Sequence, residues 1–149
     1  MRAVIQRVTA AHVSVDGRVV ARIGHGLLVL LGVDRGDAAS DRDYIAGKIR
    51  DLRIFNDEDG RMNRSVRDVA GEVLVVSQFT LSADCRRGRR PSFDQAAPPE
   101  VARTMYQAVV RALETMNLAV QTGQFQAMMQ IGLINDGPVT VLLDSRKNF

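Results

Sequence analysis

Five consecutive apolar residues, Leu27-Leu28-Val29-Leu30-Leu31, place the strongest constraint on how this chain folds. A strand with one face in water alternates apolar and polar residues, whereas an uninterrupted apolar run is typical of a strand that is covered on both faces. We therefore expect residues 27–31 to lie in the centre of a sheet.

Further stretches of the chain have the composition of strands. Asp16-Gly17 is a typical hairpin turn, and residues 56–60 form an acidic turn that lacks the twelve-residue ligand pattern of a calcium-binding EF-hand. The predicted strands cover residues 4–8, 12–15, 18–23, 53–55, 72–81, 118–122, 127–134 and 139–143. The last two of these strands form a second predicted hairpin.

Two segments repeat apolar residues at helical spacing. The first covers residues 40–52, where Ser40 and Asp43 form a capping pair, and the second covers residues 98–117, where two prolines and Glu100 mark the start. We expect a mixed α/β fold, in which two helices pack outside curved, barrel-like β-sheets. No repeat or linker divides the chain, so we expect one domain over residues 1–149.

Cysteine and histidine are too few for several kinds of site. The single cysteine, Cys85, excludes an intramolecular disulfide, and with only His12 and His25 beside it there is no usual zinc-binding cluster, although carboxylate-bound metals stay open. We expect no cofactor and no resident metal. No apolar run approaches the roughly 18 residues of a membrane span, and the first residues enter a strand pattern directly, so we expect a cytoplasmic protein without a membrane partner.

The strand predicted over residues 72–81 carries polar side chains in its middle. Alternation along a strand places Ser77 and Phe79 on one face and Gln78 and Thr80 on the other. Such a patch is either satisfied polarity within a sheet or part of a site. A nucleophilic hydroxyl needs a neighbouring base, and the sequence offers neither a histidine in a triad pattern nor a Gly-x-Ser-x-Gly elbow, so a serine hydrolase is not favoured.

Four arginines follow this strand within five positions: Arg86, Arg87, Arg89 and Arg90. Guanidinium groups bind phosphates through two parallel hydrogen bonds, and 18 of the 20 basic residues of the chain are arginine. The segment is either a solvated basic loop or a contact for a nucleic acid held beside the polar strand. The net charge of +3 does not decide between these interpretations.

Asn135-Asp136-Gly137-Pro138 interrupts the apolar pattern near the C-terminus and forms the turn of the second predicted hairpin. Proline has no amide donor and is confined to strand edges, strand starts and bulges, so a Gly-Pro pair can present two backbone carbonyls to a guest molecule. The alternative is an ordinary Asn-Asp-Gly turn that is closed by a proline.

Two of these motifs together resemble a known family. Ser77-Gln78-Phe79-Thr80-Leu81 and Asn135-Asp136-Gly137-Pro138-Val139-Thr140 resemble the paired signature of the D-aminoacyl-tRNA deacylases, and the resemblance continues through residues 1–8, 26–33, 88–93 and 123–125. It implies a homodimeric enzyme with the fold of that family. It also implies that this enzyme hydrolyses the ester bond of D-aminoacyl-tRNA, and of glycyl-tRNA mischarged on tRNA(Ala), to release the amino acid and tRNA.

The resemblance implies that Ser77, Gln78, Phe79 and Thr80 form the catalytic segment. Backbone amides near Phe79 and Thr80 would polarise the ester carbonyl in the manner of an oxyanion hole. Water, assisted by the terminal ribose hydroxyl, would then attack the ester. The alternative is that Thr80 is a covalent nucleophile, and the sequence leaves this choice open.

The resemblance also implies that the Gly137-Pro138 bond is cis and projects into the active site of the other subunit. There its two carbonyls would occupy the space that an L side chain needs, so that the L ester is rejected by exclusion. Arg7 is the candidate that fixes this wedge by donating hydrogen bonds to those carbonyls; alternatively, it is a surface arginine on an edge strand. Phe125 and Met129 line the pocket for the terminal adenine or belong to the core.

Two other classes of function compete with this interpretation. A non-catalytic tRNA-binding or RNA-binding module would use residues 86–90, but aromatic residues make up only 5% of the chain and tryptophan is absent, which disfavours the stacking surfaces of RNA-recognition modules. A small-molecule hydrolase or deaminase with a pocket shared between subunits would not require RNA. The paired motifs disfavour that second class.

Overall fold

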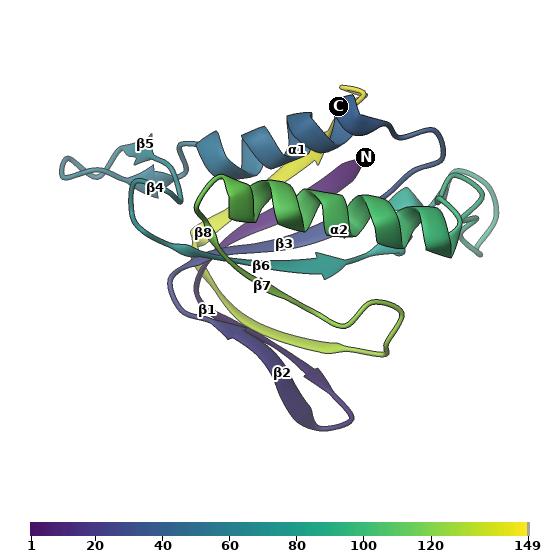
Figure 1. Ribbon diagram of the computed structural model, residues 1–149, viewed down its shortest axis with the longest axis horizontal. Helices are drawn as coiled ribbons and strands as arrows, with labels where there is room; N and C mark the ends of the chain where they lie inside the picture. The colour runs from purple at the N-terminus through teal and green to yellow at the C-terminus, as the bar shows by residue number, and fades with distance from the viewer. Residues whose placement is uncertain (149) are drawn as a thin grey trace.

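A six-stranded sheet with two helices across one face forms the body of the molecule (Figure 1). The computed structural model describes residues 1–148. In chain order the elements are β1 (Arg2–Val15), β2 (Arg18–Ile23), β3 (Gly26–Gly32), α1 (Ala39–Asp51), β4 (Phe55–Asn56), β5 (Met62–Arg64), β6 (Glu72–Ser77), the 3-10 helix η1 (Phe79–Ser82), α2 (Pro99–Thr115), β7 (Ala119–Thr122) and β8 (Gln130–Asp144). Within this part of the chain no helix is long and apolar enough to cross a membrane.

Strand β1 organises the sheet because it pairs with three other strands. Its residues 2–8 pair antiparallel with β3 and its residues 11–15 with β2, while β8 pairs with it along the other edge. β3, β6 and β7 continue the sheet as parallel neighbours. The far ends of β1 and β8 bend away together with β2, which brings β2 against β6 and β7 and gives the barrel-like curvature that the sequence predicts (Figure 1).

Two hydrophobic cores lie on the two faces of the sheet. Leu27, Val29 and Leu31 of β3 belong to the larger core, which lies beneath α1 and α2. Leu28 belongs to a second core that the curved strands enclose. Both faces of β3 are therefore covered, and β3 lies between β1 and β6, as its apolar run predicts.

Both helices lie within two residues of their predicted ranges, but the cap of α1 differs from the prediction. The Asp41 carboxylate accepts a hydrogen bond from the Ala38 amide at 2.8 Å, while Asp43 pairs with Arg42 on the surface. α1 begins one residue earlier than predicted, so Asp41 occupies the third helical position, from which a carboxylate reaches back to the amide of the capping residue.

The hairpin predicted about Gly137-Pro138 is wrong. β8 runs unbroken through this step, and both of its halves pair with β1. The register shifts here, so that Arg7 of β1 lies opposite four residues of β8, residues 136–139. Because proline cannot donate to the ladder of hydrogen bonds, these four residues bulge out of the strand instead of reversing it. We call residues 136–139 the Gly-Pro bulge.

Strand β6 is shorter than the predicted strand over residues 72–81, because it ends at Ser77 and η1 follows. The ladder with β3 stops here, and its last hydrogen bond joins the Gln78 amide to the Leu31 carbonyl at 2.8 Å. Beyond this point the backbone has no neighbouring strand and bonds locally, with the Leu81 amide 3.2 Å from the Gln78 carbonyl. We call residues 77–82 the pocket turn.

Candidate active site

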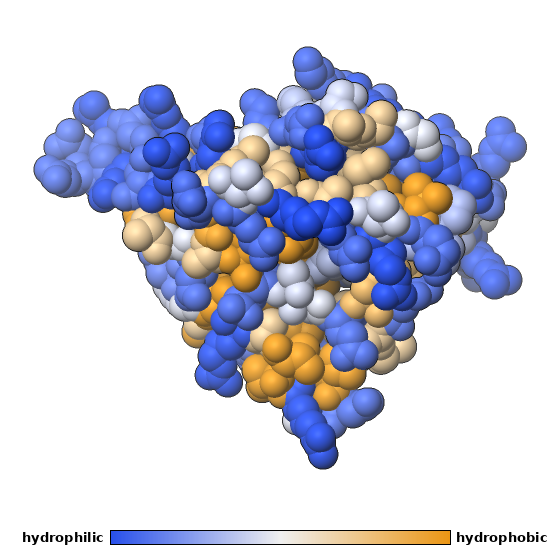
Figure 2. Space-filling model, viewed as in Figure 1, coloured by the Kyte–Doolittle hydropathy of each residue, from blue (hydrophilic) through white to orange (hydrophobic). Residues whose placement is uncertain are grey.

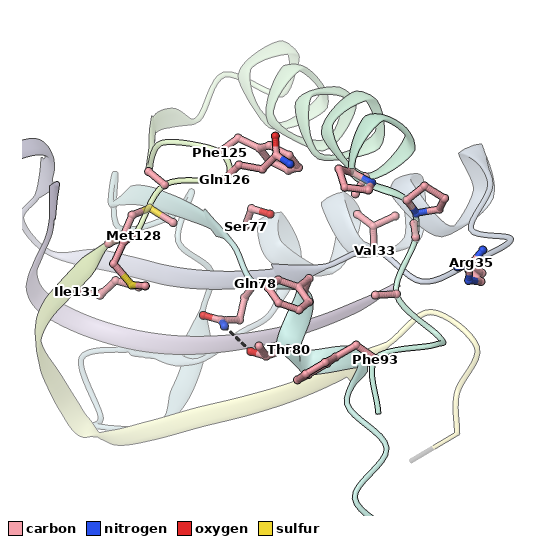
Figure 3. Close-up of a pocket in the computed structure, with 18 residues that line it drawn as sticks. Val33, Arg35, Ser77, Gln78, Thr80, Phe93, Phe125, Gln126, Met128 and Ile131 are labelled. Carbon is pink, nitrogen blue, oxygen red and sulfur yellow. Dashed lines mark hydrogen bonds between the residues drawn. The ribbon is translucent and has the colours of Figure 1, made fainter. Parts of the chain in front are cut away.

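A pocket of about 920 Å³ opens where β6 ends (Figure 3). Its walls come from the pocket turn, from the segment that leads into α2 and from residues 125–131. The lining residues are Val33, Arg35, Ser77, Gln78, Phe79, Thr80, Phe93, Ala96, Ala97, Pro98, Pro99, Ala102, Phe125, Gln126, Ala127, Met128, Met129 and Ile131. The residues predicted as catalytic and those predicted for the adenine pocket therefore line one cavity. Residues 1–148 contain no group of three His, Cys, Asp or Glu side chains placed to hold a metal ion.

The pocket turn brings Ser77, Gln78, Phe79 and Thr80 to the same cavity, so the predicted division of these residues between two faces of a strand is wrong. The Gln78 side-chain amide donates a hydrogen bond to Thr80 Oγ1 (Figure 3). The backbone amides of Phe79 and Thr80 have no acceptor within residues 1–148, because the first amides of a helical turn have no carbonyl before them to bond. The turn therefore presents unpaired backbone donors beside a hydroxyl group.

Three phenylalanine side chains, Phe79, Phe93 and Phe125, belong to the wall of the pocket. Phe79 and Phe93 meet edge to face, with their ring centroids 5.2 Å apart. The centroid of the Phe125 ring lies 5.9 Å from the centroid of the Tyr106 ring. The guanidinium carbon of Arg103 lies 4.7 Å from the centroid of the Phe125 ring. An aromatic ring in an apolar pocket wall suits a stacked base.

Arg103 and Tyr106 of α2 hold this wall in place, and sequence reasoning missed both. Arg103 Nη2 donates a hydrogen bond to Gln126 Oε1 at 2.8 Å, and the Tyr106 hydroxyl donates to the Val75 carbonyl at 2.8 Å. Burial raises the pKa of Tyr106 to about 12, so this hydroxyl stays neutral and serves as an anchor. The two residues are three positions apart and share one face of the helix. This spacing indicates a role in the pocket only once Phe125 is known to lie against that face.

The four arginines predicted to bind tRNA lie on an exposed loop. Two backbone hydrogen bonds between Asp84 and Ser92, of 2.8 and 3.0 Å, close this loop. Phe93, the next residue, lines the pocket, so the loop lies beside the pocket as predicted. Arg86 donates two hydrogen bonds to the Asp84 carboxylate at 2.9 and 2.7 Å, and this contact holds the pKa of Asp84 well below its usual range. One of the four guanidinium groups is therefore already paired.

The Gly-Pro bulge lies outside this pocket, and its Gly137-Pro138 step is exposed. The peptide bond between these two residues is cis, as the resemblance implies. Asn135 holds the base of the bulge, because its Oδ1 accepts a hydrogen bond from the Val139 amide at 2.9 Å. Gly137 has a φ of +124°, which L side chains rarely adopt, and a Cβ placed there would lie 2.8 Å from Arg7 Nη2.

Arg7 supports the bulge from the opposite strand, although not in the way predicted. It is only 7% exposed on a strand that is paired on both sides, so the alternative of a surface arginine on an edge strand is wrong. Its Nε donates to the Asp136 carbonyl at 3.1 Å, and its Nη1 donates to the Ile54 carbonyl at 2.7 Å and to Asn56 Oδ1 at 3.2 Å. Among the hydrogen bonds of residues 1–148, Arg7 makes none to the carbonyls of Gly137-Pro138. Arg7 therefore holds the bulge at Asp136 and not at the Gly137-Pro138 step.

Nearly the whole chain is similar to proteins of one kind. Residues 4–144 match the family described as D-Tyr-tRNA(Tyr) deacylase. The chain is 59% identical to the D-aminoacyl-tRNA deacylase of Desulfitobacterium hafniense and 58% identical to that of Syntrophotalea carbinolica, and each alignment covers 100% of this chain and 100% of the relative. The chain belongs to the D-Tyr-tRNA(Tyr) deacylase family. It is therefore an enzyme, a hydrolase of that family, and the resemblance predicted from its motifs is confirmed.

Solved structures also resemble this member of the D-Tyr-tRNA(Tyr) deacylase family. A protein named "c-Myc DNA Unwinding Element Binding Protein" superposes with a TM-score of 0.92 and 40% identity, over 97% of this chain and 98% of that one. A structure described as "a probable eukaryotic D-amino acid tRNA deacylase" gives a TM-score of 0.77 over 95% of this chain and 97% of that one; at 18% identity it shows the fold alone. The predicted mixed α/β fold with two helices and a barrel-like sheet is confirmed.

Proposed function

We propose that this chain hydrolyses the ester bond of D-aminoacyl-tRNA and releases the D-amino acid and tRNA. The observation that carries the proposal is the pair of unpaired amides at Phe79 and Thr80, which belong to the wall of a pocket of about 920 Å³. An ester carbonyl held there would receive backbone hydrogen bonds as its oxygen becomes negative, and losing one such donor typically costs about 2.7–4 kcal/mol. The curated relatives carry the name of this reaction.

In this reaction the oxygen of a water molecule bonds to the carbonyl carbon and the bond from that carbon to the ribose oxygen breaks. One proton of the water passes to the ribose oxygen, which leaves as a hydroxyl, and the amino acid leaves with a carboxyl group. The pocket lining holds no His, Asp or Glu side chain, so Thr80 has no general base beside it, and its Oγ1 already accepts a hydrogen bond from Gln78. These observations favour attack by water, assisted by the terminal ribose hydroxyl, over Thr80 as a nucleophile.

The Gly-Pro bulge of a second copy of the chain would complete the pocket, as part of a homodimer. The Gly137-Pro138 step of the bulge is exposed, the bulge does not line the pocket of its own chain, and β8 lies at an edge of the sheet. Leu133, Ile134 and Leu142 of β8 are exposed by 38%, 63% and 59%. Figure 2 shows apolar side chains gathered on the part of the surface where β1, β2 and β8 lie. Exposed apolar groups beside an unpaired strand edge favour such a partner.

The carbonyls of Gly137 and Pro138 from the second copy would occupy the space that an L side chain needs, while a D side chain points toward solvent. Rejection by exclusion depends on no feature of the side chain that is accepted. Many D-amino acids would therefore be substrates, and glycine, which has no side chain to exclude, would be one as well. We accordingly include glycyl-tRNA mischarged on tRNA(Ala) among the substrates.

The aromatic wall and the basic loop would hold the end of the tRNA. The terminal adenine stacks on Phe125 with Met129 beside it, and such stacking contributes roughly 1–3 kcal/mol per base. The arginines of residues 86–90 contact the phosphates at the mouth of the pocket. Because translation consumes aminoacyl-tRNA in the cytoplasm, the enzyme would act there.

A second candidate function is nucleic-acid binding without catalysis. The solved structure that is 40% identical bears the name of a DNA unwinding element binding protein, and the exposed arginines of residues 86–90 suit a phosphate backbone. Such a module would bind with a steep dependence on salt concentration and would release no amino acid. The family match disfavours the small-molecule hydrolase or deaminase.

The test offers D-tyrosyl-tRNA, L-tyrosyl-tRNA and glycyl-tRNA(Ala) to the purified chain and measures the amino acid released. We expect hydrolysis of the D and glycyl esters and no hydrolysis of the L ester. The matched control is Gly137→Val, which should be inactive. The Cβ of the new valine would lie 2.8 Å from both Arg7 Nη2 and Val139 Cγ2 and would displace the bulge. A fully active Gly137→Val protein contradicts the wedge. If no ester is cleaved while tRNA still binds, the nucleic-acid-binding candidate takes its place.

A further inference from the structure

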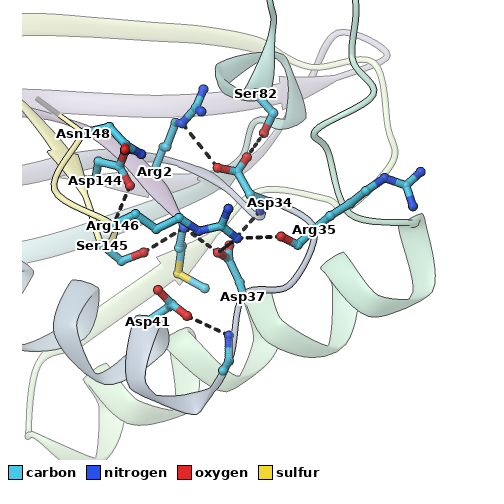
Figure 4. Close-up of polar contacts among 12 residues, drawn as sticks. Arg2, Asp34, Arg35, Asp37, Asp41, Ser82, Asp144, Ser145, Arg146 and Asn148 are labelled. Atoms are coloured by element: carbon cyan, nitrogen blue, oxygen red, sulfur yellow. Dashed lines mark hydrogen bonds and ion pairs between the residues drawn. The ribbon is translucent and has the colours of Figure 1, made fainter.

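A buried carboxylate lies behind the pocket turn (Figure 4). Asp34 is 3% exposed and accepts a hydrogen bond from the hydroxyl of Ser82, which is 1% exposed. Arg2 faces the other carboxylate oxygen, with Nε 3.3 Å from Asp34 Oδ2, and its Nη1 donates a hydrogen bond to the Leu81 carbonyl at 2.9 Å. One carboxylate is therefore linked, directly and through Arg2, to the last two residues of the pocket turn.

The backbone at Asp34 pairs with a further part of the pocket wall. Val33 and Arg35 line the pocket, and Asp34 between them forms an antiparallel bridge with Ala96. The Ala97 amide donates to the Val33 carbonyl at 2.9 Å. Asp34 therefore joins three segments of the wall: residues 33–35, the pocket turn and residues 95–97.

A buried carboxylate is costly unless it is paired and hydrogen-bonded, and well-packed apolar groups often replace a buried ion pair without loss of stability. Bulk stability is thus a weak reason for a charge at this place. The charge instead orients its neighbours: the carboxylate accepts the hydrogen bond of the Ser82 hydroxyl and attracts the Arg2 guanidinium, whose Nε lies 3.3 Å away and forms no hydrogen bond within residues 1–148. Phe79 and Thr80, whose amides face the ester in the proposed function, belong to the same short turn.

We infer that Asp34 is a positioning residue for the hydrolysis, acting through Ser82 and Arg2 on the pocket turn. The inference rests on the proposed function for the reaction and on the contacts above for the support of the turn. A misplacement of about 1 Å in reacting geometry can cost about a hundredfold in rate. A loosened turn lowers kcat, whereas KM depends on Phe125 and the arginines of residues 86–90, and within residues 1–148 Asp34 forms no hydrogen bond or ion pair with any of them.

The test uses two variants of the full chain and one control. Asp34→Asn keeps the shape of the side chain and an acceptor for Ser82 but removes the charge that faces Arg2, and Ser82→Ala removes the hydrogen bond. Asp43→Asn, on the surface of α1, is the control. We expect kcat on D-tyrosyl-tRNA to fall about tenfold or more in both variants, with KM nearly unchanged and the control unaffected.

Amide hydrogen exchange supplies a readout that does not depend on the reaction. The Leu81 and Ala83 amides bond to the carbonyls of Gln78 and Thr80 within the turn, so both should exchange faster in Asp34→Asn and Ser82→Ala. Unchanged kcat and unchanged exchange in an active enzyme overturn the inference, as does a loss of kcat that only follows the loss of folded protein. A wild-type chain that cleaves no D ester overturns the proposed function instead, while faster exchange in the variants still supports the role of Asp34 in holding the turn.

Discussion

The pocket turn and the Gly-Pro bulge carry the two motifs of this chain, and they are built in opposite ways. The turn faces a pocket of its own chain, and the buried Asp34 lies behind it. The bulge projects from the sheet, lines no part of that pocket and has the buried Arg7 behind it. In both places backbone groups are presented outward, and one buried charged side chain ties them to the fold.

This difference separates bond cleavage from discrimination in the proposed reaction. The charge that develops on the ester oxygen is common to every aminoacyl-tRNA, so one protomer can hold all the donors that stabilise it. Exclusion of an L side chain needs a rigid obstacle, and a projecting backbone supplies one from outside the pocket. The two tasks should therefore be supplied by different protomers. Because the bulge would also complete the partner's pocket, a displaced bulge should block cleavage of the D ester as well.

The largest effect is expected when two inactive variants are combined. Gly137→Val damages the bulge and spares the turn. Phe79→Pro removes one amide donor from the turn and spares the bulge, since proline is tolerated at the first position of a helical turn. Refolded together, they should regain roughly a quarter of the wild-type rate on D-tyrosyl-tRNA, because half of the dimers are mixed and each mixed dimer has one intact site.

Each variant refolded alone is the control for this recovery, and native mass spectrometry establishes that mixed dimers have formed. Mixed dimers without activity would show that the bulge acts within its own chain. In that case the pocket turn and the Gly-Pro bulge would both act within one protomer, and the proposed division of tasks between protomers would be wrong.

Replacing the support of the bulge is expected to have the next largest effect. Arg7→Met removes hydrogen bonds to the carbonyls of Asp136 and Ile54, and losing hydrogen bonds to a charged group should lower the free energy of unfolding in urea by about 1.5–3 kcal/mol. The rate on the D ester should fall further than the folded fraction does. Arg18→Met, at an exposed position of β2, is the control. Full activity in a folded Arg7→Met protein would show that the bulge holds its shape unaided.

A smaller effect is expected in the turn itself. Thr80→Ala removes the hydroxyl that Gln78 contacts, and the rate on D-tyrosyl-tRNA should fall by about tenfold or less, the value of one hydrogen bond. Loss of a covalent nucleophile would instead cost on the order of a millionfold. Single-turnover kinetics distinguish the two results, with Thr115→Ala on the exposed face of α2 as the control.

The smallest effect is expected at the aromatic wall. Arg103→Met removes the guanidinium that lies over Phe125, a contact of about 0.5–1 kcal/mol, so KM for aminoacyl-tRNA should rise about two- to fivefold while kcat stays constant. Arg111→Met, at an exposed position on the same helix, controls for the lost charge. A fall in kcat with constant KM would mean that Arg103 acts on the pocket turn and not on substrate binding.

Local pattern was enough to predict the two helices and most of the strands, because helical spacing and the apolar run of β3 are decided by residues close in sequence. It missed β5 and divided β1 into two strands. Both large errors arose where a distant strand decides the structure. β6 stops because β3 offers no further partner, and the Gly-Pro bulge replaces a hairpin because β1 continues past it on the other side. No property of residues 72–81 or 135–138 alone contains that information.

The candidate site divides in the same way. The residues of the two motifs were found because their types and order are distinctive. Asp34 and Arg103 were missed because they act through side chains 48 and 23 positions away, which only the folded chain brings near. Arg7 was found, but its hydrogen bond to the Gly-Pro bulge depends on the register between β1 and β8, and the accepting carbonyl was predicted one residue too far along the chain.

Arg2 and Arg7, which contact the pocket turn and the Gly-Pro bulge, both belong to β1 and are five residues apart. A strand advances about 3.3 Å per residue, so the chain itself sets the two Cα atoms roughly 16 Å apart. Insertion or deletion of one residue between them would move one arginine to the opposite face of the sheet. One continuous stretch of backbone therefore sets the spacing between the two supports, so an insertion or deletion between them changes the position of one support relative to the other.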